Sequence, residues 1–326
     1  MRLATVGFTD PHDGSANAAI ETAAAVHGPD GRWLLVEDLI PGGPRASLDE
    51  LLPRWEENLA ALRQVLAVPP RAPKPGRFPR PLTPREIRVP VGAPRTFRDF
   101  YAFESHVKTC REKRGLKMVP EWYEQPVFYF SNPCSLIGSE SRVQVPQGCK
   151  ELDYELELGV VIGRGGRNIA PEKAWEHVAG LTIINDFSAR DLQRKEMAVG
   201  LGPAKGKDVA TAVGPYLVTL DEMQDRIDGK GRVQLAMAAR VNGRELSRGD
   251  AASMHFTWPQ LIAQASRDAT LFPGDLIGSG TVGTGCILEL GPDTTGGWLK
   301  PGDVVELEIE KLGILRTPVG PADQPR

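Results

Sequence analysis

The sequence predicts an α+β protein in which β-structure dominates, built as one large domain with a small β-containing domain before it. Two observations lead to this prediction. After Thr96, short apolar or alternating runs bounded by glycine and proline outnumber the helical patterns. In addition, 326 residues exceed the usual length of one domain, and nine prolines at 68–95 separate two segments of different character.

Residues 1–68 are the predicted small N-terminal domain. The runs Arg2–Phe8 and Arg32–Val36 predict short strands. The segment Gly28–Gly31 reads GPDG and predicts a turn, because proline presets φ and glycine tolerates positive φ.

A helix is expected next, because Ser47 and Glu50 match a capping box. Apolar residues then recur at helical spacing as far as Leu66. Proline in a helix interior removes a hydrogen bond, so we expect the helix to start again with Pro53 in its first turn. The proline-rich residues 69–95 predict an extended connection laid along the surface.

Residues 96–326 form the predicted second domain. Helical spacing predicts helices over Phe97–Arg111, near Glu172–Val178 and over Trp258–Ser266. Asn242–Gly243 is a hairpin signal. Strands are predicted by the runs Val127–Phe130, Tyr154–Ile162, Leu181–Ile184, Tyr216–Leu220, Val233–Val241, Ile287–Leu290 and Val304–Ile309.

Charge and composition exclude several classes of function. A net charge of −3 and a pI near 6.0 give no basic surface for nucleic acid or anionic lipid. We find no signal peptide and no apolar run of membrane-spanning length, so we expect a cytoplasmic protein. The four cysteines include no CxxC motif and no ligand-like pairing with histidine, which predicts reduced, structural thiols.

Three carboxylates lie in otherwise apolar runs. Glu155 and Glu157 are two apart, so in a strand they project from the same face. Such a pair alone is also typical of a solvated strand face. Asp186 favours a cation site, because a charge flanked by LTII and FSA is costly without a partner. Hard cations such as Mg²⁺, Mn²⁺ or Ca²⁺ prefer oxygen ligands of this kind.

Two further residue types could act in catalysis. Asp99 and His106 are seven apart, which places them on roughly the same face if the segment is helical. Histidine is the usual general base at neutral pH, although a single histidine on a helix is commonly structural. Lys207 lies in a glycine-rich loop, where a lysine is commonly just solvated. Residue types alone support a metal-dependent hydrolase or lyase.

The motifs taken together resemble the fumarylacetoacetate hydrolase family. They occur in order through about residues 97–310, and the ELE and NDxSARDxQ pair is the most specific. The motifs are Asp99-Phe-Tyr101 with His106, Glu155-Leu-Glu157, Asn185-Asp186-x-Ser-Ala-Arg190-Asp-x-Gln193, Gly206-Lys207, Gly278-Ser-Gly-Thr281 and Leu288-Glu289-Leu290.

The resemblance implies a fumarylacetoacetase-like β-roll catalytic domain over 96–326, a homodimer and one divalent ion per site, with Mg²⁺ expected and Mn²⁺ or Ca²⁺ as alternatives. It implies that Glu289 orients His106 as the general base. The implied metal ligands are Asp99, Glu155, Glu157 and Asp186. The residues implied around the substrate are Lys207, Arg190, Gln193, Tyr101, Tyr129 and Thr281.

By the same resemblance, the expected reaction is hydrolysis of a C–C bond in a small-molecule diketo acid, an acylpyruvate or a fumarylacetoacetate-like compound, in aromatic-compound catabolism. Met197 departs from the family, which has a substrate-contacting tyrosine there. Either Arg111 or Arg114 could bind a substrate carboxylate. The alternatives are a metal-dependent decarboxylase, hydratase or isomerase of 2-oxo acids with the same fold, or a catalytically silent binding protein.

Overall fold

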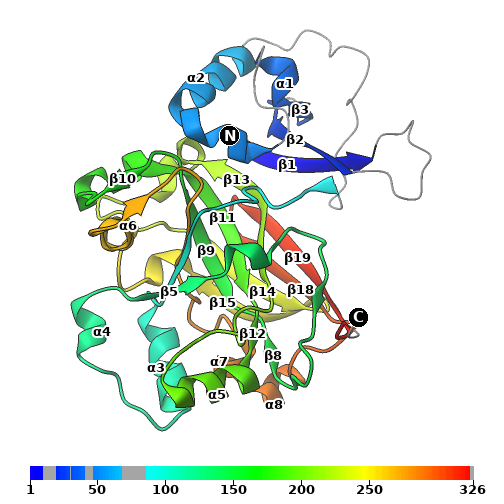
Figure 1. Cartoon of the computed structure of the whole chain (residues 1–326), viewed down its shortest axis with the longest axis vertical. Helices are drawn as coiled ribbons and strands as arrows, with labels where there is room; N and C mark the ends of the chain where they lie inside the picture. The colour runs from blue at the N-terminus through cyan, green and yellow to red at the C-terminus, as the bar shows by residue number, and fades with distance from the viewer. Residues whose placement is uncertain (10–19, 30, 41–46, 68–85, 324–326) are drawn as a thin grey trace.

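The computed structural model describes residues 1–9, 20–29, 31–40, 47–67 and 86–323 (Figure 1). The N-terminal strands and helices lie at one end of the molecule, long central strands run through its middle, and helices α3 and α5 lie at the other end. Within the described ranges, no helix is long and apolar enough to cross a membrane.

A ten-stranded sheet forms the centre of the molecule, in the order β3-β2-β1-β13-β11-β9-β17-β4-β5, with β6 also paired to β13. Strand β1 joins the N-terminal strands to the rest through antiparallel pairing with β13. The strands are β1 (Arg2–Thr9), β2 (Ile20–His27), β3 (Trp33–Leu35), β4 (Phe97–Phe100), β5 (Phe128–Ser131), β6 (Leu136–Ile137), β9 (Leu156–Ile162), β11 (Val178–Asp186), β13 (Thr211–Thr219) and β17 (Leu276–Gly278).

A second sheet of five strands has the order β15-β14-β18-β19-β7. Two short ribbons, β10 with β16 and β8 with β12, complete the strands of the described chain. Their bounds are β7 (Val143–Gln144), β8 (Leu152–Asp153), β10 (Gly166–Arg167), β12 (Ser188–Ala189), β14 (Ala236–Val241), β15 (Arg244–Asp250), β16 (Thr270–Leu271), β18 (Val304–Ile309) and β19 (Gly313–Gly320).

The helices are short and lie around the sheets. The α-helices are α1 (Val36–Leu39), α2 (Trp55–Leu66), α3 (Glu104–Glu112), α4 (Glu121–Glu124), α5 (Arg190–Val199), α6 (Trp258–Ser266), α7 (Ile287–Leu290) and α8 (Pro292–Thr295). The 3₁₀ helices cover Leu48–Glu50, Leu52–Arg54, Pro133–Ser135, Pro171–His177, Leu220–Arg226 and Ala251–Ser253.

The central strands β9 and β11 are buried along their whole length. Their apolar side chains alternate between two hydrophobic clusters, with Leu158 and Val160 in one and Val161 and Ile184 in the other. A strand covered on both faces has no solvated side for a charged residue. Acidic side chains on these strands therefore need polar or cationic partners.

The predicted fold class is confirmed, and most predicted strands of the second domain are present within a few residues. The hairpin at Asn242–Gly243 joins β14 to β15. Strand β2, which is rich in alanine, was not predicted, nor were β17 and β19. The GPDG turn includes residue 30, and the proline-rich connection includes residues 68–85, which lie outside the described residues.

Several predicted elements were wrong. Phe97–Arg111 is not one helix: its first four residues form β4, which pairs with β17 and β5, and α3 begins only at Glu104. Ile287–Leu290 is a single helical turn rather than a strand. Ser47 makes no capping hydrogen bond from its side chain, whereas the prediction of a helix restarting around Pro53 is confirmed by α2.

Candidate metal centre and active site

Three carboxylates from neighbouring strands converge at one point. Asp99 on β4, Glu157 on β9 and Asp186 at the end of β11 each offer an oxygen, and these oxygens lie within 4.8 Å of one another. Strand β17 lies between β4 and β9. Its residue Gly278 has no side chain, which leaves space for Asp99 and Glu157 to approach each other across this strand. A Cβ atom at Gly278 would collide with Asp99 Oδ1 and would lie 3.1 Å from Glu157 Oε2.

The charge balance of this cluster is unfavourable without a cation. Burial, together with repulsion from neighbouring carboxylates, raises the pKa of Asp99 and of Glu157 well above their usual values. Among the described residues, Asp99 Oδ1 and Glu157 Oε2 have no hydrogen-bond partner although both are buried. Buried oxygens of this kind are almost always satisfied. The cluster therefore fits a divalent cation that prefers oxygen ligands.

Lys207 supplies a positive charge to the same cluster. Its Nζ lies 2.6 Å from Asp186 Oδ2 and also contacts Glu155 Oε2. Burial lowers the pKa of Lys207, but Asp186 and Glu155 outweigh burial and raise it above its usual value. Lys207 is therefore a permanently charged ammonium inside the site, not the solvated loop residue that its glycine-rich sequence allows.

Glu155 lies beside the three carboxylates and is already paired. Arg190 Nη2 donates to Glu155 Oε1 at 2.7 Å, and Lys207 holds the other oxygen. Burial raises the pKa of Glu155, but Lys207 and Arg190 outweigh it and hold the pKa below its usual value. Of the four predicted metal ligands, the structure groups three and places the fourth within this ion-pair network. The assignment of Glu155 as a ligand stays a prediction.

Asp153 is a site residue that sequence reasoning missed. It accepts a hydrogen bond from Arg190 Nε at 2.9 Å, and it accepts from the backbone N–H groups of Ile287 and Leu288 at 2.7 and 3.0 Å. Asp153 therefore fixes the Arg190 side chain and the start of α7 together. The available signal was its position two residues before Glu155, in the alternating run Asp153-x-Glu-x-Glu.

A buried histidine–carboxylate pair lies on the other side of the cavity. His106 Nδ1 is 2.5 Å from Glu289 Oε1, and Glu289 Oε2 accepts from the Thr284 backbone N–H. Burial lowers the pKa of His106, but its hydrogen bonds with Cys286 and Glu289 outweigh burial and raise the pKa to about 10. The predicted pair forms, although His106 reaches it from α3 while Asp99 lies on a strand.

Two thiols flank this histidine. Cys110 Sγ lies 3.8 Å from both ring nitrogens of His106, and Cys286 Sγ lies 3.7 Å from Glu289 Oε1. The sequence shows no ligand-like pairing of a cysteine with a histidine, whereas the structure places Cys110 and Cys286 beside His106. The four-residue spacing of His106 and Cys110 on one helix was the signal, because residues i and i+4 face the same way.

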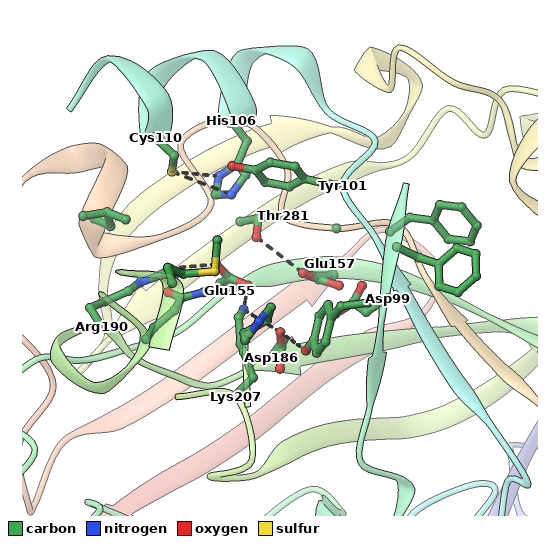
Figure 2. Close-up of a pocket in the computed structure, with 18 of the residues that line it drawn as sticks. Asp99, Tyr101, His106, Cys110, Glu155, Glu157, Asp186, Arg190, Lys207 and Thr281 are labelled. Carbon is green, nitrogen blue, oxygen red and sulfur yellow. Dashed lines mark hydrogen bonds and ion pairs between the residues drawn. The ribbon is translucent and has the colours of Figure 1, made fainter. Parts of the chain in front are cut away.

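The side chains described above line one cavity of about 360 Å³, with the exception of Asp153, Cys286 and Glu289. Figure 2 shows His106 and Cys110 on the helix side of it, opposite Glu157 and Asp186 on the strand side. Apolar and aromatic side chains cover much of the wall. The lining includes Asp99, Phe100, Tyr101, His106, Cys110, Arg114, Val127, Phe128, Tyr129, Glu155, Glu157, Asp186, Arg190, Gln193, Arg194, Met197, Pro203, Lys207, Gly280, Thr281 and Leu288.

The predicted substrate-binding residues all reach this cavity, but several also support the carboxylates. Tyr129 donates to Asp186 Oδ2 at 2.7 Å, and Thr281 Oγ1 lies 3.4 Å from Glu157 Oε1. Gln193 Oε1 accepts from Arg190 Nη1 at 3.2 Å. Tyr101 packs edge-on against His106, with ring centroids 5.4 Å apart.

The structure distinguishes the two candidate arginines. Arg114 lines the cavity, whereas Arg111 does not, and Arg111 Nε donates to the Lys117 carbonyl at 2.6 Å. Met197 also lines the cavity and is half exposed. Arg114 is therefore the one of these two arginines that lies where it could bind a substrate carboxylate.

Comparison with known proteins gives a consistent result. A family model described as fumarylacetoacetate (FAA) hydrolase C-terminal matches residues 95–320. The chain is 32% identical over 320 residues to human oxaloacetate tautomerase FAHD2A, mitochondrial, which covers 97% of this chain and 90% of the relative.

Two solved structures are similar to the whole fold or to most of it. Fumarylacetoacetate hydrolase from Exiguobacterium antarcticum superposes with a TM-score of 0.70 at 26% identity, covering 98% of this chain and 100% of the other. Fumarylpyruvate hydrolase from Pseudomonas aeruginosa, in complex with Mn²⁺ and pyruvate, superposes with a TM-score of 0.58 at 26% identity, covering 71% and 91%.

Proposed function

Because the chain belongs to the fumarylacetoacetate hydrolase family, we propose that it is a divalent-metal-dependent enzyme whose substrate is a diketo acid or a 2-oxo acid and whose reaction passes through an enolate. The observation that carries this proposal is the arrangement of two sets of groups on one cavity. Buried carboxylates with unpaired oxygens form one wall, and the His106–Glu289 pair adjoins the other.

Asp99, Glu157 and Asp186 would hold the ion, with Glu155 as the fourth predicted ligand. A divalent ion bound there supplies Lewis-acid polarisation of the 2-oxo group and stabilises negative charge on the enolate oxygen. Mg²⁺ is the ion we propose first, with Mn²⁺ or Ca²⁺ as alternatives, because the donors are all carboxylate oxygens. The Pseudomonas relative contains Mn²⁺.

The protein's own groups provide the rest of the chemistry. Lys207 and Gln193 face the cavity and would donate hydrogen bonds to substrate oxygens as negative charge develops, each worth about 3 kcal/mol in such a site. Arg114 would bind a second substrate carboxylate, at the end of the molecule away from the metal. The apolar wall would exclude water from the enolate.

The reaction we propose first is hydrolytic C–C cleavage of a diketo acid, an acylpyruvate or a fumarylacetoacetate-like compound. His106 in its neutral form would remove a proton from water as that water adds to the carbonyl of the acyl group that leaves as a carboxylic acid. Glu289 holds the ring and stabilises the imidazolium that forms. The C–C bond then breaks, which releases one carboxylic acid and the enolate, and the imidazolium would return its proton to the enolate carbon to give the second acid. The cavity has room beyond a four-carbon acid.

A second candidate is tautomerisation of oxaloacetate. It is favoured by the similarity to an oxaloacetate tautomerase along almost the whole chain. It is also favoured by the raised pKa of His106, about 10, because His106 is then an imidazolium at neutral pH. An imidazolium donates a proton to an enol carbon but cannot accept one from water. In the tautomerisation the enol hydroxyl would release its proton to solvent as the carbon is protonated, so neither candidate needs a further protein group.

A spectrophotometric screen of the purified protein tests the proposal. Acylpyruvates, fumarylacetoacetate-like diketo acids and oxaloacetate are each incubated with Mg²⁺, Mn²⁺ or EDTA, and the products are identified. Metal-dependent loss of diketone absorbance with two acids formed would establish C–C hydrolysis. Enol–keto conversion of oxaloacetate alone would establish the second candidate. Equal rates with Mg²⁺ and EDTA on every substrate would contradict both. The homodimer and the cytoplasmic location stay predictions.

A further inference from the structure

A cluster of soft ligands lies across the cavity from the cluster of carboxylates. One ligand atom each from His106, Cys110 and Cys286 lies within 4.8 Å of the others, and all three residues are buried. We propose that these three side chains form a second metal site, for a thiophilic divalent ion such as Zn²⁺, and that filling it switches the enzyme off.

The spacing of the donors is close to what such an ion needs. Around a tetrahedral zinc with bonds of about 2.0 Å to nitrogen and about 2.3 Å to sulfur, ligand atoms lie about 3.3–3.8 Å apart. Cys110 Sγ is 3.8 Å from each nitrogen of His106. The two sulfurs are at most 4.8 Å apart. The Cys286 sulfur is likewise at most 4.8 Å from a His106 nitrogen, so the thiols need to move by roughly 1 Å.

Glu289 completes the set as a fourth ligand, and this explains the inhibition. Its Oε1 is 3.7 Å from Cys286 Sγ, which matches two ligands of one ion, but only 2.5 Å from His106 Nδ1. Two ligands of a tetrahedral ion cannot approach that closely, so an ion held by both His106 Nδ1 and Glu289 Oε1 opens the His106–Glu289 hydrogen bond. The ion would also coordinate a ring nitrogen of His106, whose lone pair could then no longer accept a proton.

The two sites select different ions by the chemistry of their donors. Thiolate and imidazole suit zinc and other borderline or soft ions, whereas carboxylates suit Mg²⁺, Ca²⁺ and Mn²⁺. An ion can reach the second site through the cavity, because Cys110 and His106 line it. Figure 2 shows these two side chains together, facing the cavity across from Glu157 and Asp186. Zn²⁺ should therefore inhibit even when Mg²⁺ saturates the carboxylates.

Cobalt absorption tests the binding directly, without any assumption about the reaction. Protein kept reduced by a phosphine and saturated with Mg²⁺ is titrated with Co²⁺. We expect a thiolate-to-cobalt charge-transfer band that is lost in Cys110→Ser and in Cys286→Ser and kept in Cys134→Ser, whose thiol is exposed. Thermal unfolding of each variant confirms that it is folded. No band in the wild type, or an unchanged band in Cys110→Ser and Cys286→Ser, would overturn the site.

The inhibition rests on the proposed function of His106 and Glu289, and it is measured separately as the Zn²⁺ concentration that halves each protein's own rate. Loss of one ligand should raise that concentration at least as much as loss of an outer hydrogen-bond partner does, roughly 10- to 100-fold. The Cys134→Ser variant should match the wild type. A cobalt band without zinc inhibition would overturn the switch while leaving the proposed reaction intact.

Discussion

Lys207 Nζ lies 2.6 Å from Asp186 Oδ2, and both groups are buried in the carboxylate cluster. The ammonium also contacts Glu155. Lys207 is therefore a candidate catalytic group. It also offsets the negative charge of the carboxylate cluster when no metal is bound. Removing one partner of a buried ion pair leaves an uncompensated charge, which is costly.

Lys207→Met should destabilise the metal-free protein by about 3–5 kcal/mol, because Asp186 and Glu155 lose their ammonium partner. Mg²⁺ should restore more stability to this variant than to the wild type, since the ion then supplies the missing charge. Urea unfolding with and without Mg²⁺ measures both effects. Lys205→Met is the matched control, because Lys205 is exposed and its pair with Asp208 is worth at most about 1 kcal/mol. Equal losses in the two variants would contradict the account.

Asp153→Asn should lower both stability and kcat, because Asp153 joins Arg190 to the start of α7, the helical turn that carries Glu289. We expect a loss of about 3–5 kcal/mol in the free energy of unfolding, since Glu155 is then the one ion-pair partner left to Arg190 among the described residues. Denaturant unfolding and steady-state kinetics measure this. Asp268→Asn is the control, because its carboxylate is exposed. Wild-type kcat in a folded Asp153→Asn protein would exclude the positioning role.

The His106–Glu289 pair predicts a defined pH dependence of stability. The folded pKa of His106, about 10, lies above its usual 6.5. The pair's stabilisation is therefore fully present below about pH 6.5 and is lost as pH rises through about 10, by at most about 1.4 kcal/mol per pH unit. Glu289→Gln should flatten this slope in urea unfolding measured from pH 6 to 10. An unchanged slope would show that Glu289 does not raise the histidine pKa.

The same pKa separates the two candidate reactions by their rates. If neutral His106 activates water, kcat should rise as pH increases towards about 10. If the imidazolium donates a proton to an enol carbon, kcat should fall over the same range. A pH–rate profile of the wild type therefore assigns the role of His106 once the substrate is known.

Arg114→Ala should raise KM for a substrate with a distal carboxylate roughly 10- to 100-fold, since a charged hydrogen bond is worth about 1.5–3 kcal/mol. The variant should affect a substrate without that carboxylate much less. Arg111→Ala is the matched control, because Arg111 points to the Lys117 carbonyl and does not line the cavity. Kinetics on paired mono- and dicarboxylic substrates test this. The same KM increase for both substrates would exclude Arg114 as the carboxylate-binding residue.

Local sequence pattern was sufficient for the centre of the fold and for part of the site. Glu157 and Asp186 were placed on strands, because long apolar runs bounded by turns have few alternatives in a β-rich chain. Asp186 lies in an apolar run, where a charge without a partner is costly, so a cation was predicted beside it. The structure shows both Lys207 and two unpaired carboxylate oxygens there. Glu155 was also a candidate ligand from residue types, whereas Asp99 entered the predicted ligand set only through the family resemblance.

The errors arose where distant contacts decide local structure. Asp99 was expected on a helix with His106, but pairing with β17 and β5 makes its segment a strand. Glu289 was expected on a strand, but Asp153, far away in the sequence, caps the two N–H groups that start α7. Cys286 and His106 lie close together only in the folded protein, so no local sequence pattern predicts their contact.

The central claim is that the carboxylate cluster binds a metal ion and supports enolate formation from a 2-oxo acid. Proton NMR in D₂O measures this directly, as exchange of the C3 protons of pyruvate and, above its non-enzymatic rate, of oxaloacetate. We predict exchange that requires Mg²⁺ or Mn²⁺, stops with EDTA, and is lost in Glu157→Gln together with metal binding. Exchange that is unaffected by EDTA and by Glu157→Gln, or no exchange from either acid with metal present, would contradict the account.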